Sequence, residues 1–214
     1  MDNQEFENVD LPNFGEVSTD NNVTDQKAAQ DHSALTYLHD VVHLIAGIVL
    51  IFLLCFRVVV VFGPSMDQTL CHGDYLLLLG NVFYREPQQG DIIVASKDSF
   101  DDGEPIIKRV IATEGQIVDI DFSQGIVYVD GEALDEPYTN TPTNLSEGVR
   151  FPLTVEEGCV FVMGDNRNES KDSRSPQIGL VDRREILGKA IFLLLPGQSG
   201  AGGERYFNRI GVLS

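Results

Sequence analysis

Lys108 lies in an isoleucine- and valine-rich run, "PIIKRVI" at 105–111, which has the composition of a β-strand. Side chains alternate along a strand, so Lys108 shares a face with Ile106 and Val110. A free amine with a pKa of about 10.4 is neutral in about one molecule in 2,500 at pH 7, a penalty of about 4.6 kcal/mol for a base. Burial among apolar neighbours lowers a lysine pKa by up to about 3–5 units. The pattern therefore predicts that Lys108 is a general base.

Ser65 is the candidate hydroxyl for such a base. It follows the apolar run "VVVVF" and a Gly-Pro pair, a turn that exposes a serine while its neighbours stay fixed. A third segment, "MGDNRNESKDSRSPQIGLV" at 163–181, has the composition of a polar loop. Each segment alone has an ordinary structural explanation, but together they indicate serine chemistry with a lysine base.

The segments beyond residue 63 that would position these residues have β character. Short apolar or alternating runs are separated by Gly, Pro, Asp and Asn, which predicts strands joined by turns. The runs are "DYLLLLG", "DIIVAS", "PIIKRVIA", "QIVDID", "GIVYVDG", "CVFVMGD" and "KAIFLLL". Asp130-Gly131 predicts a hairpin and "DRREIL" a helical turn. We therefore predict a mainly β protein with an antiparallel sheet.

An apolar stretch, "VVHLIAGIVLIFLLCFRVVVVFG" at 41–63, precedes the β-rich part. It reaches the length of about 20 residues needed to cross a membrane if the helix begins near "ALTYLHD". A buried core helix is the alternative, but the stretch has no polar stripe. A cleaved signal is disfavoured, since the preceding segment is long and acidic. The β-branched valines predict a switch from helix to strand at Arg57.

These features divide the sequence into four parts. We predict an acidic disordered tail at 1–33, a transmembrane helix at 34–57, a β-rich domain at 58–196, and a glycine-rich linker with a C-terminal segment at 197–214. The last ten residues either dock as a closing strand or hang free.

Composition excludes several partners. The net charge of -18, from 33 acidic and 15 basic residues, argues against nucleic acid, whose phosphates would be repelled. Three cysteines without C-x-x-C spacing and four histidines argue against a structural zinc site, and no cofactor is expected. Cys71 and Cys159 either pair or remain thiols. The sequence specifies no oligomeric state.

Four ordered motifs resemble those of bacterial type I signal peptidases, membrane-anchored Ser–Lys proteases that remove signal peptides from exported proteins. They are "SMDQTL" at 65–70, "GDYLLLL" at 73–79, "KRVIATEG" at 108–115 and "GDNRNESKDSR" at 164–174. The resemblance runs from about residue 41 to 196. It implies a β-sheet catalytic domain tethered by one N-terminal helix, with the N-terminus in the cytoplasm and the catalytic domain outside.

The resemblance also implies a role for each motif residue. Ser65 is expected to be the nucleophile and Lys108 the general base, which later gives its proton to the leaving amine. Ser170 is expected to hydrogen-bond the Lys108 amine and orient it.

Two ion pairs are expected to support the dyad. The resemblance implies that Asp172 pairs with Arg174 beneath the site and that Arg109 pairs with Asp165.

Two positions close to Ser65 in the sequence differ from the family pattern. The Ser65 N–H is expected to donate to the oxyanion. Some family members place a serine two positions before the nucleophile as a second donor, and here that position is Gly63. Gln68 replaces the proline of the family motif, which loosens the backbone without removing a catalytic group.

The expected substrate is an extended signal peptide, held between the strands that lead into Ser65 and Lys108 by β-strand addition. The resemblance implies cleavage after Ala-x-Ala, with shallow apolar pockets. The candidate pocket residues are Phe62, Gly63, Met66 and Ile107. The expected partners are preproteins and membrane lipid, because a shared membrane raises the effective substrate concentration.

Two other functions fit parts of the pattern. Self-cleaving Ser–Lys proteases related to the SOS repressors share the dyad, but the anchor and the absence of a DNA-binding region disfavour them. A tethered β-domain that only binds a partner would be expected to lack Ser65 or Lys108, and both are present.

Overall fold

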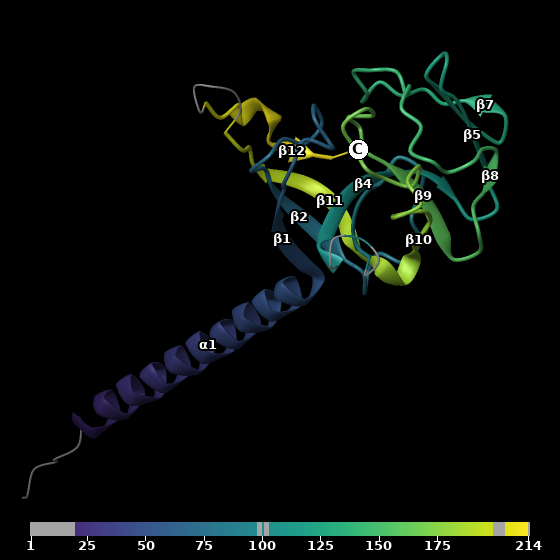
Figure 1. The fold of residues 1–214 in the computed structure, drawn as a ribbon. Coiled ribbons are helices and arrows are strands. Elements are labelled where there is room, and N and C mark those ends of the chain that lie inside the picture. Colours follow the sequence, from purple (N-terminus) through teal and green to yellow (C-terminus); the bar gives the residue numbers. More distant parts are fainter. Residues whose placement is uncertain (1–19, 98–99, 101–102, 199–203, 214) are drawn as a thin grey trace, which may run out of the picture. The chain divides into compact units, whose positions relative to one another are not determined.

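A computed structural model of the chain describes residues 20–97, 100, 103–198 and 204–213, with side chains from residue 36 onward. The chain divides into two compact units, Met1–Leu50 and Ile51–Ser214. Figure 1 shows the long helix α1, Asp20–Cys55, and the β-rich second unit. Within α1, Thr36–Cys55 has a mean hydropathy of 2.3 and none of it is buried, so it is long and apolar enough to span a membrane.

The start of α1 corrects the predicted tail. The prediction of disorder at 1–33 is wrong for residues 20–33, which are helical, while residues 1–19 lie outside the described part of the chain. No glycine or proline occurs between residues 16 and 46, so nothing in the sequence stops the helix from extending toward the N-terminus. The helix ends at Cys55 and strand β1 begins at Phe56, slightly before the predicted switch at Arg57.

The second unit holds two antiparallel sheets, which confirms the predicted fold class. The large sheet has the order β1-β2-β11-β3-β4-β9-β10, with β12 paired to β11. Its strands are β1 Phe56–Val60, β2 Tyr75–Gly80, β3 Ile92–Ser96, β4 Pro105–Thr113, β9 Cys159–Met163, β10 Val181–Asp182, β11 Ile186–Leu195 and β12 Gly211–Val212.

The small sheet has the order β7-β6-β5-β8. Its strands are β5 Ile117–Asp121, β6 Ile126–Val129, β7 Glu132–Ala133 and β8 Leu153–Thr154, and two 3-10 helices complete the described elements, η2 Arg183–Glu185 and η3 Phe207–Arg209. The predicted hairpin joins β6 to β7, with positive φ angles of 54° at Asp130 and 84° at Gly131. The predicted helical turn is η2, which Asp182 caps.

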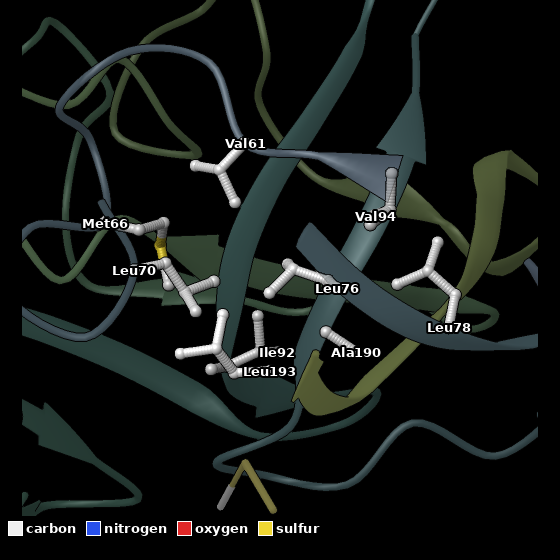
Figure 2. Packing of buried hydrophobic residues seen from close by; sticks show 9 residues of the cluster. All are labelled: Val61, Met66, Leu70, Leu76, Leu78, Ile92, Val94, Ala190 and Leu193. Atoms are coloured by element: carbon white, nitrogen blue, oxygen red, sulfur yellow. The ribbon is translucent and has the colours of Figure 1, made fainter. Parts of the chain in front are cut away.

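Alternating strand residues build the core beneath the two catalytic candidates. In β2 every second residue is buried, and Leu76 and Leu78 pack against Ile92 and Val94 of β3 (Figure 2). A second cluster, which includes Ile111 of β4, lies between the large and small sheets.

The sheet order brings distant segments together. Strand β11 comes late in the sequence but lies between β2 and β3, and it bonds to both. Strands β1 and β4 are therefore not neighbours in the sheet, because β2, β11 and β3 lie between them. Ser65, which follows β1, and Lys108 of β4 come together only when the sheet has formed.

The C-terminal segment docks as a strand, one of the two possibilities left open by the sequence. Val212 and Gly211 of β12 pair with Phe192 and Leu193 of β11. Residues 199–203, which include most of the predicted linker glycines, lie outside the described residues. Cys71 and Cys159 are not joined by a disulfide.

Candidate active site

Ser65 lies on a loop after β1, and buried side chains fix that loop from below. The Leu70 N–H donates to the Met66 carbonyl at 2.8 Å, which closes a helical turn. Met66 and Leu70 are 1% and 0% exposed and pack in the core beside Val61 (Figure 2). Ser65 itself is partly exposed. The apolar side of the turn thus holds the backbone and leaves the hydroxyl accessible.

Lys108 reaches this hydroxyl from β4. Its side chain is 5% exposed, and Nζ lies 2.8 Å from Ser65 Oγ, within hydrogen-bonding distance. Burial lowers the pKa of Lys108 to about 8, although the negative charges of Asp172, Glu147 and Asp165 oppose the shift. With this pKa about one molecule in ten carries a neutral amine at pH 7. A neutral amine at this distance is able to accept the hydroxyl proton.

Arg109, the next residue in β4, forms the expected ion pair with Asp165. Arg109 Nε donates to Asp165 Oδ1 at 2.9 Å, and Nη2 donates to Oδ2 at 2.8 Å. The two residues are 1% and 0% exposed, so each neutralises the other's buried charge. The Arg109 guanidinium also lies 4.0 Å from the ring centre of Tyr138.

The expected Asp172–Arg174 pair is also present and closes the loop 164–174 on itself. Arg174 Nε and Nη2 donate to the two oxygens of Asp172, both at 2.8 Å. Asp172 Oδ2 accepts a further bond from the Gly164 N–H at 3.0 Å. Arg174 Nη2 also donates to the Arg167 carbonyl at 2.6 Å. The loop is fixed by groups that lie within it.

The same loop holds the backbone of Ser65. The Asn166 N–H donates to the Ser65 carbonyl at 3.1 Å, and Asn166 Nδ2 donates to the Pro64 carbonyl at 3.1 Å. Gly164 packs so closely that a Cβ at this position would lie 2.4 Å from the Ser65 carbonyl oxygen. Only glycine allows this approach.

Ser170 differs from its expected role. It is 4% exposed, but its Oγ has no hydrogen-bond partner, so the predicted bond to the Lys108 amine is absent. The side chain instead lies against Gly164, where an added Cβ would be 2.2 Å from Ser170 Oγ. The motif places Ser170 close to the site but does not determine where its hydroxyl points.

A groove of about 580 Å³ leads to Ser65 and Lys108. Residues from the segment that enters Ser65 line one part of the groove, and the start of β4 lines another part. Three of the four predicted pocket residues line it: Phe62, Gly63 and Ile107. Met66 does not, because it points into the core. Glu104, which the sequence did not single out, also lines the groove.

Gly63 has a φ of +84°, a conformation that side chains rarely adopt. A serine at this position would therefore be strained, even though the space around it is open. Its N–H donates to Nδ1 of His72 at 3.3 Å.

Two further charged groups near the site were missed by the sequence reasoning. Glu147 belongs to no motif, and burial together with the charge of Asp172 raises its pKa. Arg167 lies within the quoted motif and pairs with Glu136, which holds the loop before β8 against the site. Only the position of Arg167 inside "GDNR" could have indicated its importance.

Comparisons with known proteins show the family to which the chain belongs. Residues 34–195 match the family described as signal peptidase, peptidase S26. A probable signal peptidase I-1 from Synechocystis sp. is 40% identical over 151 residues, which cover 65% of this chain and 73% of the relative. Signal peptidase I from Bacillus licheniformis is 34% identical over 142 residues, which cover 63% of this chain and 74% of the relative.

A crystal structure of a signal peptidase I from Enterococcus faecalis V583 is 31% identical, covers 49% of this chain and 96% of that chain, and has a TM-score of 0.40. The family match spans most of the sequence, and both relatives exceed 30% identity over more than two thirds of their own length. The chain therefore belongs to the signal peptidase family, peptidase S26.

Proposed function

We propose that this protein is a membrane-bound serine endopeptidase that cleaves signal peptides from exported preproteins, with Ser65 as nucleophile and Lys108 as general base. The observation that carries the proposal is the 2.8 Å contact between Ser65 Oγ and the buried Lys108 Nζ. A neutral amine at this distance removes the hydroxyl proton as the bond to substrate forms.

The reaction follows in two halves. Ser65 Oγ attacks the carbonyl carbon of the scissile bond while Lys108 Nζ takes its proton. The tetrahedral intermediate then collapses, the C–N bond breaks, and the Lys108 ammonium gives its proton to the leaving amine. Water then attacks the carbonyl carbon of the resulting ester while Lys108 Nζ takes a proton from it. The C–O bond to Ser65 breaks, the Lys108 ammonium gives its proton to Ser65 Oγ, and the carboxylic acid is released.

The surrounding residues keep this pair in place. The Arg109–Asp165 pair fixes the strand residue next to Lys108, and Asn166 holds the Ser65 carbonyl. The Ser65 N–H is the proposed oxyanion donor. Gly63 has no hydroxyl, so it cannot supply the second side-chain donor that some family members have at this position.

The groove favours an extended peptide with small side chains close to the cut. Phe62 and Ile107 give it apolar walls, which suits alanine at the first and third positions before the scissile bond. Thr36–Cys55 would hold the enzyme in the membrane that also holds the apolar part of the substrate.

A cleavage assay in detergent tests the dyad. The full chain should cut a precursor peptide with an Ala-x-Ala site in trans, and Ser65→Ala or Lys108→Ala should abolish cutting. Ser123→Ala and Lys171→Ala are matched controls, since both residues are exposed and lie outside the groove. Cleavage that survives in Lys108→Ala at the rate of Lys171→Ala would rule out the dyad.

The proposed orientation places the N-terminus in the cytoplasm and the catalytic unit outside. Protease added to spheroplasts should then digest residues 56–214 and spare a tag fused before Met1. Loss of the tag with an intact catalytic unit would reverse the orientation.

A further inference from the structure

The C-terminal segment, residues 204–213, packs against the loop that carries Ser65. We call residues 64–74 the nucleophile loop. Leu213 packs against the core cluster that contains Met66 and Leu70, and its N–H donates to the Ile191 carbonyl at 3.1 Å. This segment lies beyond the family match, which ends at residue 195.

Arg209 in this segment forms a bidentate ion pair with Asp74, at the end of the nucleophile loop. Arg209 Nη2 donates to Asp74 Oδ2 at 2.6 Å, and Nη1 donates to Oδ1 at 3.1 Å. The Asp74 side chain is 0% exposed and that of Arg209 is 20% exposed. A buried carboxylate requires such a partner, since an unpaired charge away from water is strongly unfavourable.

Asp74 in turn binds the backbone on both sides of it. Oδ2 accepts from the Cys71 N–H at 2.8 Å, within the nucleophile loop. Oδ1 accepts from the Gly197 N–H at 2.7 Å, at the start of the C-terminal part. The carboxylate therefore joins the nucleophile loop to the chain that follows β11, and Arg209 fixes the carboxylate.

Arg209 also reaches the middle of the nucleophile loop. Its Nη2 donates to the Thr69 carbonyl at 3.1 Å. Thr69 Oγ1 donates to Asp165 Oδ2 at 2.5 Å, and Asp165 pairs with Arg109, the neighbour of Lys108. The bonds of Thr69 thus connect Arg209 to the ion pair beside the dyad.

We infer that Arg209 is a positioning residue for the reaction: it holds the nucleophile loop so that Ser65 stays within reach of Lys108. The inference rests on the proposed function for its effect on cleavage. Its effect on the loop is independent of that function. The planar guanidinium matters, because one side chain must bind the Asp74 carboxylate and the Thr69 carbonyl together.

Hydrogen exchange tests the loop directly. In the full chain in detergent, Arg209→Ala should speed backbone exchange in residues 66–73 by about tenfold or more, since the bonds that close the loop lose their support. Arg205→Ala is the matched control: Arg205 lies in the same segment and donates to the Pro196 carbonyl at 3.1 Å. Exchange in 66–73 that matches the control would overturn the inference, whether or not the protein cleaves peptides.

Cleavage kinetics test the consequence. Arg209→Ala should lower kcat by about tenfold or more, because small displacements of a nucleophile are costly, and leave KM within about twofold. Arg209→Lys keeps the positive charge but lacks the planar guanidinium. Its kcat should therefore lie between those of the parent and of Arg209→Ala. A kcat within about twofold of Arg205→Ala would overturn the positioning role.

Two controls separate the possible failures. If the parent chain cuts no faster than Ser65→Ala, the proposed function fails, and hydrogen exchange still decides whether Arg209 holds the loop. If Arg209→Ala does not fold, Arg209→Lys decides: faster exchange with lower kcat supports the inference, and parent values for both overturn it.

Discussion

Replacing Lys108 by methionine tests whether burial of the amine is what makes it a base. Methionine has a similar length and no charge, so it removes the amine while filling much of the same space. Activity should disappear. The free energy of unfolding, in contrast, should rise at neutral pH. The parent buries an amine that is mostly protonated at this pH in a site that disfavours the protonated form, and the variant does not.

The magnitude follows from the two pKa values. The pKa of Lys108 is about 8 in the folded chain and 10.5 in an ordinary lysine. At pH 7 both states are mostly protonated, and the 2.5-unit difference costs the folded state about 3 kcal/mol. The lost contact with Ser65 Oγ offsets about 1 kcal/mol of this. The net gain expected for Lys108→Met is about 2 kcal/mol at pH 7.

The dependence on pH gives the sharper result. A lowered folded-state pKa means that the penalty is fully present below about pH 8 and disappears as the pH rises through about 10.5. Between pH 7 and pH 10 the advantage of the variant should therefore shrink by about 2.5 kcal/mol.

Denaturant unfolding of both proteins in detergent at pH 7, 8, 9 and 10 measures this difference. Lys171→Met serves as the control, because Lys171 is exposed. A stability difference between parent and Lys108→Met that stays constant from pH 7 to pH 10 would refute the burial argument.

Two further predictions concern groups around the dyad. The parent kcat/KM should rise with pH to a plateau above about 8, as Lys108 loses its proton. In Glu147→Gln this rise should move to lower pH, because the carboxylate favours the protonated amine; a rise that stays in place or moves upward would contradict the assigned charge effect. Gly164→Ala should lower kcat by about tenfold or more, since its Cβ would lie 2.4 Å from the Ser65 carbonyl oxygen. Gly211→Ala, where space is open, is the control, and equal rates for the two variants would show that the Ser65 backbone tolerates the displacement.

The strands could be predicted because their signals are local. The alternation in "DYLLLLG" and the turn residues Asp130-Gly131 specify β2 and the β6–β7 hairpin without reference to the rest of the chain. The 2.8 Å contact between Ser65 and Lys108 could be anticipated because the motifs carry the long-range information that single strands lack.

The predictions that were wrong, and the residue that was missed, concern side chains whose direction depends on tertiary packing. Met66 follows Ser65 directly, yet the helical turn that it closes with Leu70 points it into the core instead of the groove. Ser170 lies in the expected loop, but its hydroxyl lies close to Gly164 and has no hydrogen-bond partner. Arg209 lies far from every motif, and only the docking of β12 brings it to Asp74.

The position of β11 affects when Ser65 and Lys108 can come together. Because β11 is made late yet separates β2 from β3, a growing chain that has not reached Ile186 has no strand to join the two halves of the large sheet. Ser65 and Lys108 both precede Ile186 in the sequence, and β11 joins the parts of the sheet that carry them. We therefore expect the contact between Ser65 and Lys108 to form only after β11 is in place, so a chain truncated before Ile186 should lack hydrolytic activity.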